Sequence, residues 1–202
     1  MKKVHTIMST LLMVLIAPIL FASEDKMNAE IVKVYREDIP STRFIGKKYS
    51  AEDFVGSNIG EKWGMWFENN WFDVIKKQGE TASSKEIFDK VGETVGLWYM
   101  TKDSDGSEYW IGSFMPANTT IPDGFSYMDF PASSLGVCWV YGSIPAVFGA
   151  NDIVLKRLKK EGFEIIPDEK GRYWTLESYF CPRYTTPDEH GKVILDRSYT
   201  IK

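Results

Sequence analysis

A carboxylate surrounded by aromatic residues stands out in residues 172–181, RYWTLESYFC. The alternation is typical of a strand, in which successive side chains point to opposite faces. One face then carries Tyr173, Thr175, Glu177 and Tyr179, and the core-facing side carries Trp174, Leu176 and Phe180. Placing a charge among rings costs free energy unless a partner pairs with it, and we expect that partner to be a ligand. The pattern predicts a pocket for a cationic or polar-aromatic molecule. A solvated strand whose tyrosines favour β structure is the alternative.

The sequence offers few other residues for chemistry. Beyond the N-terminal segment it has one histidine, His190, in a turn-like stretch, and it has no nucleophile elbow and no phosphate-cradling glycine loop. This histidine and the cysteine spacing exclude the usual zinc patterns, so we expect no metal and no cofactor. Hydrolysis with Glu177 as the general base that activates water is the catalytic alternative to binding.

Two cysteines, Cys138 and Cys181, both fall within expected strands. An exported protein could join them in a disulfide. The other interpretation is that both are small buried hydrophobic residues. The sequence leaves the two interpretations open.

The N-terminus has the pattern of an export signal. Lys2 and Lys3 precede an apolar run over residues 7–20, and the small residues Ala22 and Ser23 follow it. This run is short for a permanent membrane helix. We therefore predict a signal peptide over residues 1–23 and one mature domain over residues 24–202, located in the periplasm or secreted, without a membrane span. An uncleaved anchor is the alternative.

The charge balance argues against one class of partner. The 202-residue chain has a formal net charge of −4, and losing the two lysines of the signal segment, which has no acidic residue, makes it −6. Phosphate backbones attract proteins with basic patches or runs. We therefore expect a small-molecule ligand and no nucleic acid.

The elements that would position Glu177 come in two successive sets. The first has strands over residues 29–37, 42–49, 94–101 and 108–115, a helix over 61–77 with one apolar stripe, and a short helix from residue 84. The second has strands over residues 133–141, 173–180 and 192–201 and a helix over 145–161.

These sets form two β-α-β-β units, about residues 29–116 and 125–202. They predict an α+β fold with an antiparallel sheet, helices on one face and a ligand cleft where the units meet. Trp98 in the first unit occupies the place of Glu177 in the second. Both side chains would then point toward a shared space.

Six short motifs carry a resemblance to a known family. They are Gly96-Leu-Trp-Tyr99, Tyr109-Trp-Ile-Gly112, Ile121-Pro-Asp-Gly-Phe125, Phe130-Pro-Ala132, the helix after Gly142, and Leu176-Glu-Ser-Tyr179. With this order and spacing, residues 29–202 resemble the GyrI-like small-molecule-binding family, also called AraC-type or bacterial-regulator effector-binding domains.

The resemblance implies a duplicated β-α-β-β fold whose central cavity is lined by aromatic residues and holds an acidic residue of the second repeat. Members bind drug-like, often cationic and lipophilic, compounds, either alone or fused to DNA-binding domains. The motif match places the acid at Glu177, with Tyr179 and Trp98 as neighbouring rings. Further candidates, whose faces depend on strand register, are Trp66, Trp110, Trp139 and Tyr141.

We therefore expect non-catalytic binding of a small aromatic or cationic lipophilic molecule, with Glu177 as the acidic anchor. Some GyrI-like proteins resemble hydrolases that use the same acid, so hydrolysis stays open. The chain departs from the family pattern because it lacks a helix-turn-helix and carries the export segment. Its seven tryptophans leave a third interpretation, an envelope module that docks other proteins through an exposed patch.

Overall fold

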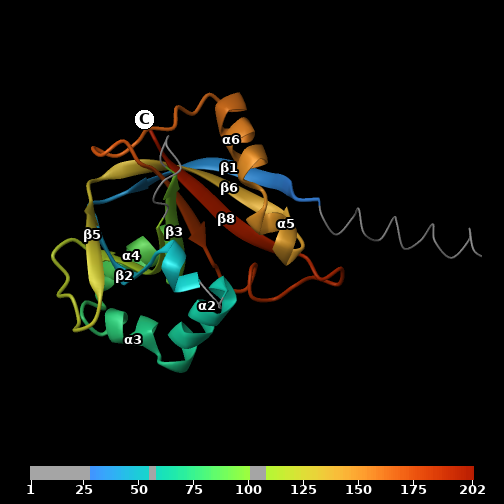
Figure 1. The fold of residues 1–202 in the computed structure, drawn as a ribbon. Helices are drawn as coiled ribbons and strands as arrows, with labels where there is room; N and C mark the ends of the chain where they lie inside the picture. Colours follow the sequence, from blue (N-terminus) through green and yellow to red (C-terminus); the bar gives the residue numbers. More distant parts are fainter. Residues whose placement is uncertain (1–27, 55–57, 101–107) are drawn as a thin grey trace, which may run out of the picture.

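The computed structural model describes residues 28–54, 58–100 and 108–202 (Figure 1). The predicted signal peptide over residues 1–23 therefore lies outside the described residues. None of the described helices is both long and apolar enough to cross a bilayer.

The described strands form an eight-stranded antiparallel sheet. They are β1 (Glu30–Ile39), β2 (Thr42–Tyr49), β3 (Val95–Met100), β4 (Tyr109–Pro116), β5 (Ser126–Phe130), β6 (Ser133–Gly142), β7 (Tyr173–Ser178) and β8 (Val193–Ile201). Their order across the sheet is β1-β6-β8-β7-β3-β4-β2-β5. This arrangement is the α+β antiparallel architecture that the sequence predicts. Strand β5 was not among the expected elements.

The helices pack beside this sheet. They are the 3-10 turn η1 (Ala51–Phe54) and the α-helices α2 (Ile59–Glu68), α3 (Trp71–Lys76), α4 (Ala82–Val91), α5 (Ile144–Phe148) and α6 (Asn151–Lys160). The single helices expected over residues 61–77 and 145–161 are each broken in two. Asn70 adopts the left-handed conformation (φ 52°) between α2 and α3, which asparagine tolerates better than most residues. Gly149 ends α5.

The strand order reads as two halves that meet at β7 and β3. Strands β6, β8 and β7 form one half, and β2, β4 and β3 form the other in mirrored order. The outer strands are exchanged, because β1 pairs with β6 and β5 pairs with β2. Pro40 separates β1 from β2 and Pro131 separates β5 from β6. Proline has no N–H to donate, so each of these residues interrupts strand pairing and lets the chain turn toward the other half.

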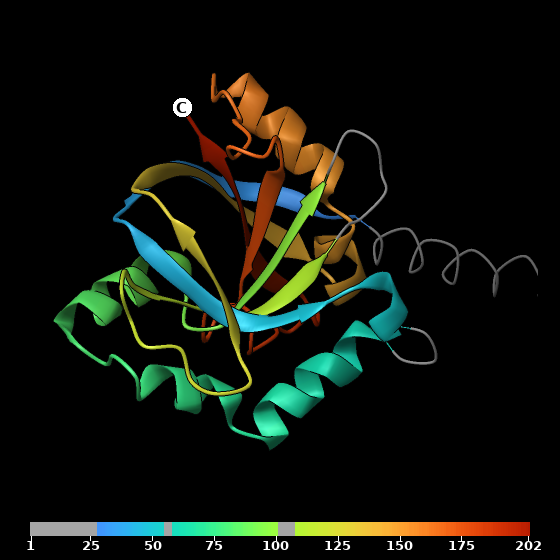
Figure 2. The same ribbon diagram turned by 60° about the vertical axis from the view of Figure 1, so that its left-hand side comes forward.

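Side chains on the two faces of the sheet build three apolar clusters. On one face, α2 and α3 cover Ile45, Ile111 and Met115, while α5 and α6 cover Cys138, Val140 and Leu195. Figures 1 and 2 show these two helix pairs over different halves of the sheet. The opposite face encloses a cluster that includes Leu97 and Leu176, to which α4 adds Ile87 and Val91.

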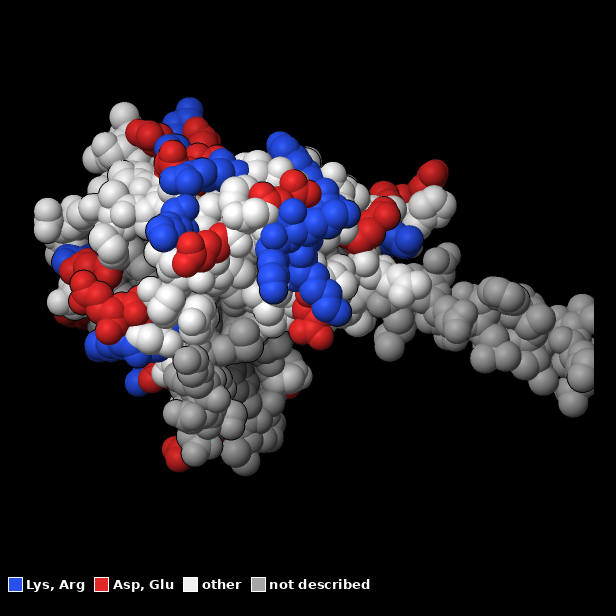
Figure 3. Space-filling view, turned by 90° about the horizontal axis from the view of Figure 1, so that it is seen from above, with Lys and Arg blue, Asp and Glu red and all other residues white. Residues whose placement is uncertain are grey.

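Helix α6 ends with three basic residues, Arg157, Lys159 and Lys160. Basic side chains gather on this side of the molecule, as the space-filling view shows (Figure 3). Cations in the last turn of a helix interact favourably with its dipole. The cluster therefore stabilises the end of α6.

Candidate functional site

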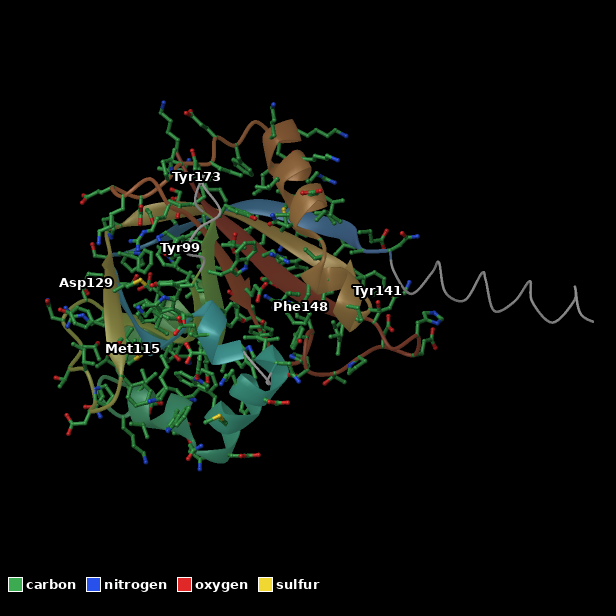
Figure 4. The ribbon with its side chains drawn as sticks, in the orientation of Figure 1. Tyr99, Met115, Asp129, Tyr141, Phe148 and Tyr173 are labelled. Carbon is green, nitrogen blue, oxygen red and sulfur yellow. The ribbon has the colours of Figure 1, made fainter. Side chains whose placement is uncertain are left out.

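A cavity of about 1380 Å³ lies over β3, β4 and β7, bordered by α2 and α5. Its aromatic lining includes Trp63, Phe67, Trp98, Tyr109, Phe148 and Tyr179. Figure 4 shows Phe148 at α5, on the side that faces α2. Ligand pockets commonly have volumes of roughly 300 to 1,000 Å³. The cavity is therefore large enough for a drug-sized molecule.

Glu177 lies in this cavity and is only 6% exposed. Its Oε2 accepts hydrogen bonds from the hydroxyls of Tyr109 (3.2 Å) and Tyr179 (3.0 Å). The indole N–H of Trp63 donates to the Tyr109 oxygen at 3.2 Å. The ring of Trp63 also meets that of Tyr179 edge to face, with 4.6 Å between centroids. These contacts fix three aromatic side chains around one carboxylate.

Arg197 also contacts Glu177, and this corrects the expectation that the carboxylate has no partner within the chain. Its Nη2 lies 3.6 Å from Glu177 Oε1, and its side chain is 1% exposed. The contact follows from strand pairing, because Glu177 of β7 stands directly opposite Arg197 of β8. The floor of the cavity therefore carries an ion pair rather than a lone negative charge.

The two tyrosines beside Glu177 remain hydrogen-bond donors over a wide pH range. Burial, and then the negative charge of Glu177, raises the pKa of Tyr109 and that of Tyr179 well above the usual value of 10. The same two causes raise the pKa of Tyr184, which also lines the cavity. Because the phenols stay protonated, their O–H groups stabilise a carboxylate rather than compete with it.

Gly96 provides the space that this cluster occupies. It stands opposite Glu177 in the pairing of β3 with β7. A methyl group built on Gly96 would collide with the Tyr109 hydroxyl and lie 3.1 Å from Glu177 Oε2. The absence of a side chain thus allows the hydroxyl and the carboxylate to approach the backbone closely.

Charged residues also line the cavity away from its floor. Asp89, Glu93 and Glu108 are acidic and Arg183 is basic. The Arg183 guanidinium makes a paired contact with Asp196, at 2.8 Å and 2.7 Å, and lies 3.9 Å from the ring centroid of Phe180. Glu93 pairs with Lys76 at 2.8 Å and Glu108 pairs with Lys48 at 3.1 Å, so these two carboxylates already have counterions within the chain.

The structure brings three of the seven predicted ligand-binding residues together. Glu177, Tyr179 and Trp98 all line the cavity. The other four, Trp66, Trp110, Trp139 and Tyr141, lie outside its lining. Three of the seven predicted residues therefore belong to the candidate site.

Each of the four excluded residues has a local explanation. Trp66 is a fully buried residue of α2, and its indole N–H donates to the Tyr49 hydroxyl at 2.9 Å. Trp110 and Trp139 pack in or against the cluster on the opposite face of the sheet, as strand alternation requires. Tyr141 donates to Asp188 at 2.6 Å, and Figure 4 shows it beside α5, away from α2.

Both cysteines are free, so the disulfide that the sequence allows is not formed. Cys138 is buried under α5 and α6, where burial raises its pKa to about 12. Cys181 is exposed and lines the cavity. The two thiols belong to different environments, one in a core and one at a solvent-facing edge.

Several residues of the site were missed from the sequence. Trp63 and Phe148 fall within the helices expected over residues 61–77 and 145–161, but neither was predicted to contact a ligand. Tyr109 stands in a quoted motif without an assigned role. The pairing of Arg197 with Glu177 could have been found by aligning the two last strands in antiparallel register. In the part of the chain that the structure describes, no group of three or more His, Cys, Asp or Glu side chains is placed to hold a metal ion.

No family model and no curated protein sequence matches the chain. Solved structures do match its fold. SAV2435, in a structure with bound tetraphenylphosphonium, is 13% identical with a TM-score of 0.53, and the match covers 85% of this chain and 94% of that one. EcmrR, in a cryo-EM structure of its DNA complex, is 8% identical with a TM-score of 0.50, and the match covers 100% of this chain and 68% of that one. The chain therefore has the fold of GyrI-like effector-binding domains.

Proposed function

We propose that this chain binds a small, lipophilic aromatic molecule, neutral or cationic, in the cavity over β3 and β7 without transforming it. The observation that carries the proposal is the buried carboxylate of Glu177 beneath a large cavity lined by rings. Rings supply apolar contact and attract positive charge at their faces, at about 0.5–2 kcal/mol for each cation–π contact. A modest ligand with a few such contacts would bind with micromolar affinity.

The rim of the cavity supports an apolar ligand. Four of its residues expose large apolar side chains to solvent: Ile59 and Phe67 of α2, and Ile144 and Phe148 of α5. Phe67 alone is 59% exposed. Clustered exposed apolar groups around a concave surface are typical of ligand sites. A lipophilic molecule that enters would cover surface that is now in contact with water.

The contacts of Glu177 favour binding over hydrolysis. A general base must reach a water molecule with a free lone pair and transfer the proton onward. The groups that contact Glu177 are two phenols and a guanidinium, all of them hydrogen-bond donors, so none is suited to pass a proton onward. The likeness to SAV2435, a protein solved with a lipophilic aromatic cation, also supports binding.

Calorimetric titration with two probes tests the proposal. We expect both tetraphenylphosphonium and the neutral triphenylmethanol to bind saturably at a single site. Trp98→Ala should weaken both by about tenfold, since its ring lines the cavity. Trp139→Phe is the matched control outside the lining and should leave both affinities unchanged.

Two results would contradict the proposal. The first is the absence of saturable binding for both probes. The second is turnover of activated esters that disappears in Glu177→Gln, which would establish Glu177 as a general base.

A further inference from the structure

Arg197 is held differently from the other arginine that pairs with a buried acid at this end of the sheet. Arg183 makes two short contacts with Asp196, at 2.8 Å and 2.7 Å. Arg197 instead reaches Glu177 with one nitrogen at 3.6 Å, and its Nε is buried without a hydrogen-bond partner among the described residues. An arginine that forms a strong ion pair commonly donates two parallel hydrogen bonds from its planar guanidinium to the carboxylate. The Glu177–Arg197 pair is loose by comparison.

The remaining contacts of Arg197 fix its position beneath the cavity. Its Nη1 donates to the carbonyl oxygens of Phe148 (2.7 Å) and Val147 (3.3 Å) at the end of α5. The guanidinium carbon lies 5.8 Å from the ring centroid of Trp98. Arg197 thus stays close to Glu177 even though the two are not tightly bonded.

The two carboxylate oxygens of Glu177 therefore have different partners. Oε2 accepts from two phenols, as described above. For Oε1, the contact with Arg197 at 3.6 Å is longer than a hydrogen bond to a charged group, which is typically about 2.7–2.9 Å. Oε1 therefore keeps acceptor capacity for an N–H or O–H donor of a ligand.

A cation placed beside Glu177 meets two opposing charges. Coulomb energy falls only as the inverse of distance, so a cation a few ångströms from the carboxylate is also repelled by the guanidinium behind it. A neutral ligand with a hydrogen-bond donor meets no such opposition.

We propose that Arg197 determines the charge preference of this cavity: by offsetting Glu177, it favours neutral aromatic ligands that carry an N–H or O–H donor over permanent cations. This inference rests on the proposed binding function. Arg197 does not itself line the cavity. It is a positioning residue that acts through Glu177, because its positive charge offsets the negative charge that Glu177 presents to the ligand.

The experiment measures the affinities of tetraphenylphosphonium and triphenylmethanol for the full chain and its variants. The first probe is a permanent cation without a donor, and the second is neutral with one O–H. Wild type should bind triphenylmethanol at least as tightly as tetraphenylphosphonium. Arg197→Met should raise the affinity for tetraphenylphosphonium by about tenfold or more and change that for triphenylmethanol by less than about threefold.

Three further variants separate charge from structure. Arg197→Lys keeps the charge and should keep the wild-type ratio of affinities. Arg197→Met/Glu177→Gln removes both charges, folds without an unpaired buried ion, and should not gain cation affinity. Arg43→Met removes a distant arginine that pairs with Asp129 at 2.7 Å, and should leave the ratio unchanged.

The outcomes distinguish the two proposals. If neither probe binds wild type or any variant, the proposed function fails. If both probes bind but the ratio is the same in wild type, Arg197→Met and Arg43→Met, the role of Arg197 is refuted while the binding function stands. If Arg197→Met does not fold, a rise in cation affinity in the double variant would equally refute it.

Discussion

The two halves of the sheet place different chemistry at matching positions. On the cavity side, the first half pairs Trp98 of β3 with Tyr109 of β4. At the corresponding place in the second half, Glu177 of β7 pairs with Arg197 of β8. The same cross-strand position thus holds two rings on one side of the β3–β7 boundary and two opposite charges on the other.

The helices repeat this contrast. The cluster under α2 and α3 contains the rings of Trp66 and Phe72 together with Tyr49 of β2. The cluster under α5 and α6 is largely aliphatic, with Val147, Val154 and Leu158 among its members. The first half therefore has the more aromatic cluster, and the second half holds the buried ion pair of the site. The cavity draws rings from both halves, such as Trp98 from the first and Tyr179 from the second, so it forms only where the halves meet.

The largest effect should come from the aromatic half. Trp66→Ala removes a fully buried indole and its hydrogen bond to Tyr49, so it should lower the free energy of unfolding by about 4 kcal/mol. Val154→Ala, at a fully buried position of the aliphatic half, should cost only about 2 kcal/mol. Urea unfolding measures both. Equal losses would break the contrast between the two clusters.

The charged half should respond next. Glu177→Gln leaves Arg197 buried without a counterion, and we expect it to lower the free energy of unfolding by about 3 kcal/mol. Glu164→Gln alters an exposed pair with Lys202 and should change it by less than about 0.5 kcal/mol. A loss in Glu177→Gln as small as in the control would show that the ion pair is solvated.

Alkaline pH should lower the stability of the folded protein through the two tyrosines beside Glu177, where the two halves of the sheet meet. The pKa of Tyr109 and that of Tyr179 are raised in the folded protein, so their stabilising contribution is complete below the unfolded value of about 10. It is lost as pH rises above 10 toward the folded values, at up to about 1.4 kcal/mol per pH unit for each tyrosine. Between pH 8 and 11, the free energy of unfolding should fall less steeply with rising pH in Tyr109→Phe or Tyr179→Phe than in wild type. Tyr127→Phe, on exposed β5, is the matched control, and an unchanged slope in the first two variants would contradict the prediction.

The smallest effect is a difference in thiol reactivity. Cys181 is exposed at the cavity and should react with a disulfide reagent in the native protein, whereas buried Cys138, with its pKa raised to about 12, should react only after unfolding. Tetraphenylphosphonium should slow the reaction of Cys181. In Cys181→Ser, no thiol should react before unfolding. Two fast thiols, or none, in wild type would contradict this assignment.

Much of the fold follows from the sequence because it depends on local patterns. Alternation located the strands, apolar stripes located the helices, and the parity of β7 put Glu177 and Tyr179 on the cavity side together. The breaks in the two helices were not predicted, because the apolar pattern continues on both sides of Asn70 and of Gly149.

The rest of the site depends on register, which a sequence does not state. Tyr109 and Trp110 are neighbours in the chain, yet they face opposite sides of the sheet, and choosing the wrong one moves a ring out of the cavity. The contact of Arg197 with Glu177 likewise requires the exact pairing of β7 with β8. A lone acid was a reasonable expectation from one strand, but its counterion lies on the next.

Because β1 lies against β6 and β5 against β2, neither unit completes its own edge. A fragment of residues 28–121 would contain β1 but not its partner strand β6. Unpaired strand edges tend to pair with strands of other chains. Two such fragments would satisfy each other reciprocally, as in a swapped homodimer. Size-exclusion chromatography of the fragment should therefore report a dimer, and a stable monomer would argue otherwise. If the intact protein is cleaved between β4 and β5, the two fragments should remain associated, because β1 still pairs with β6 and β5 with β2.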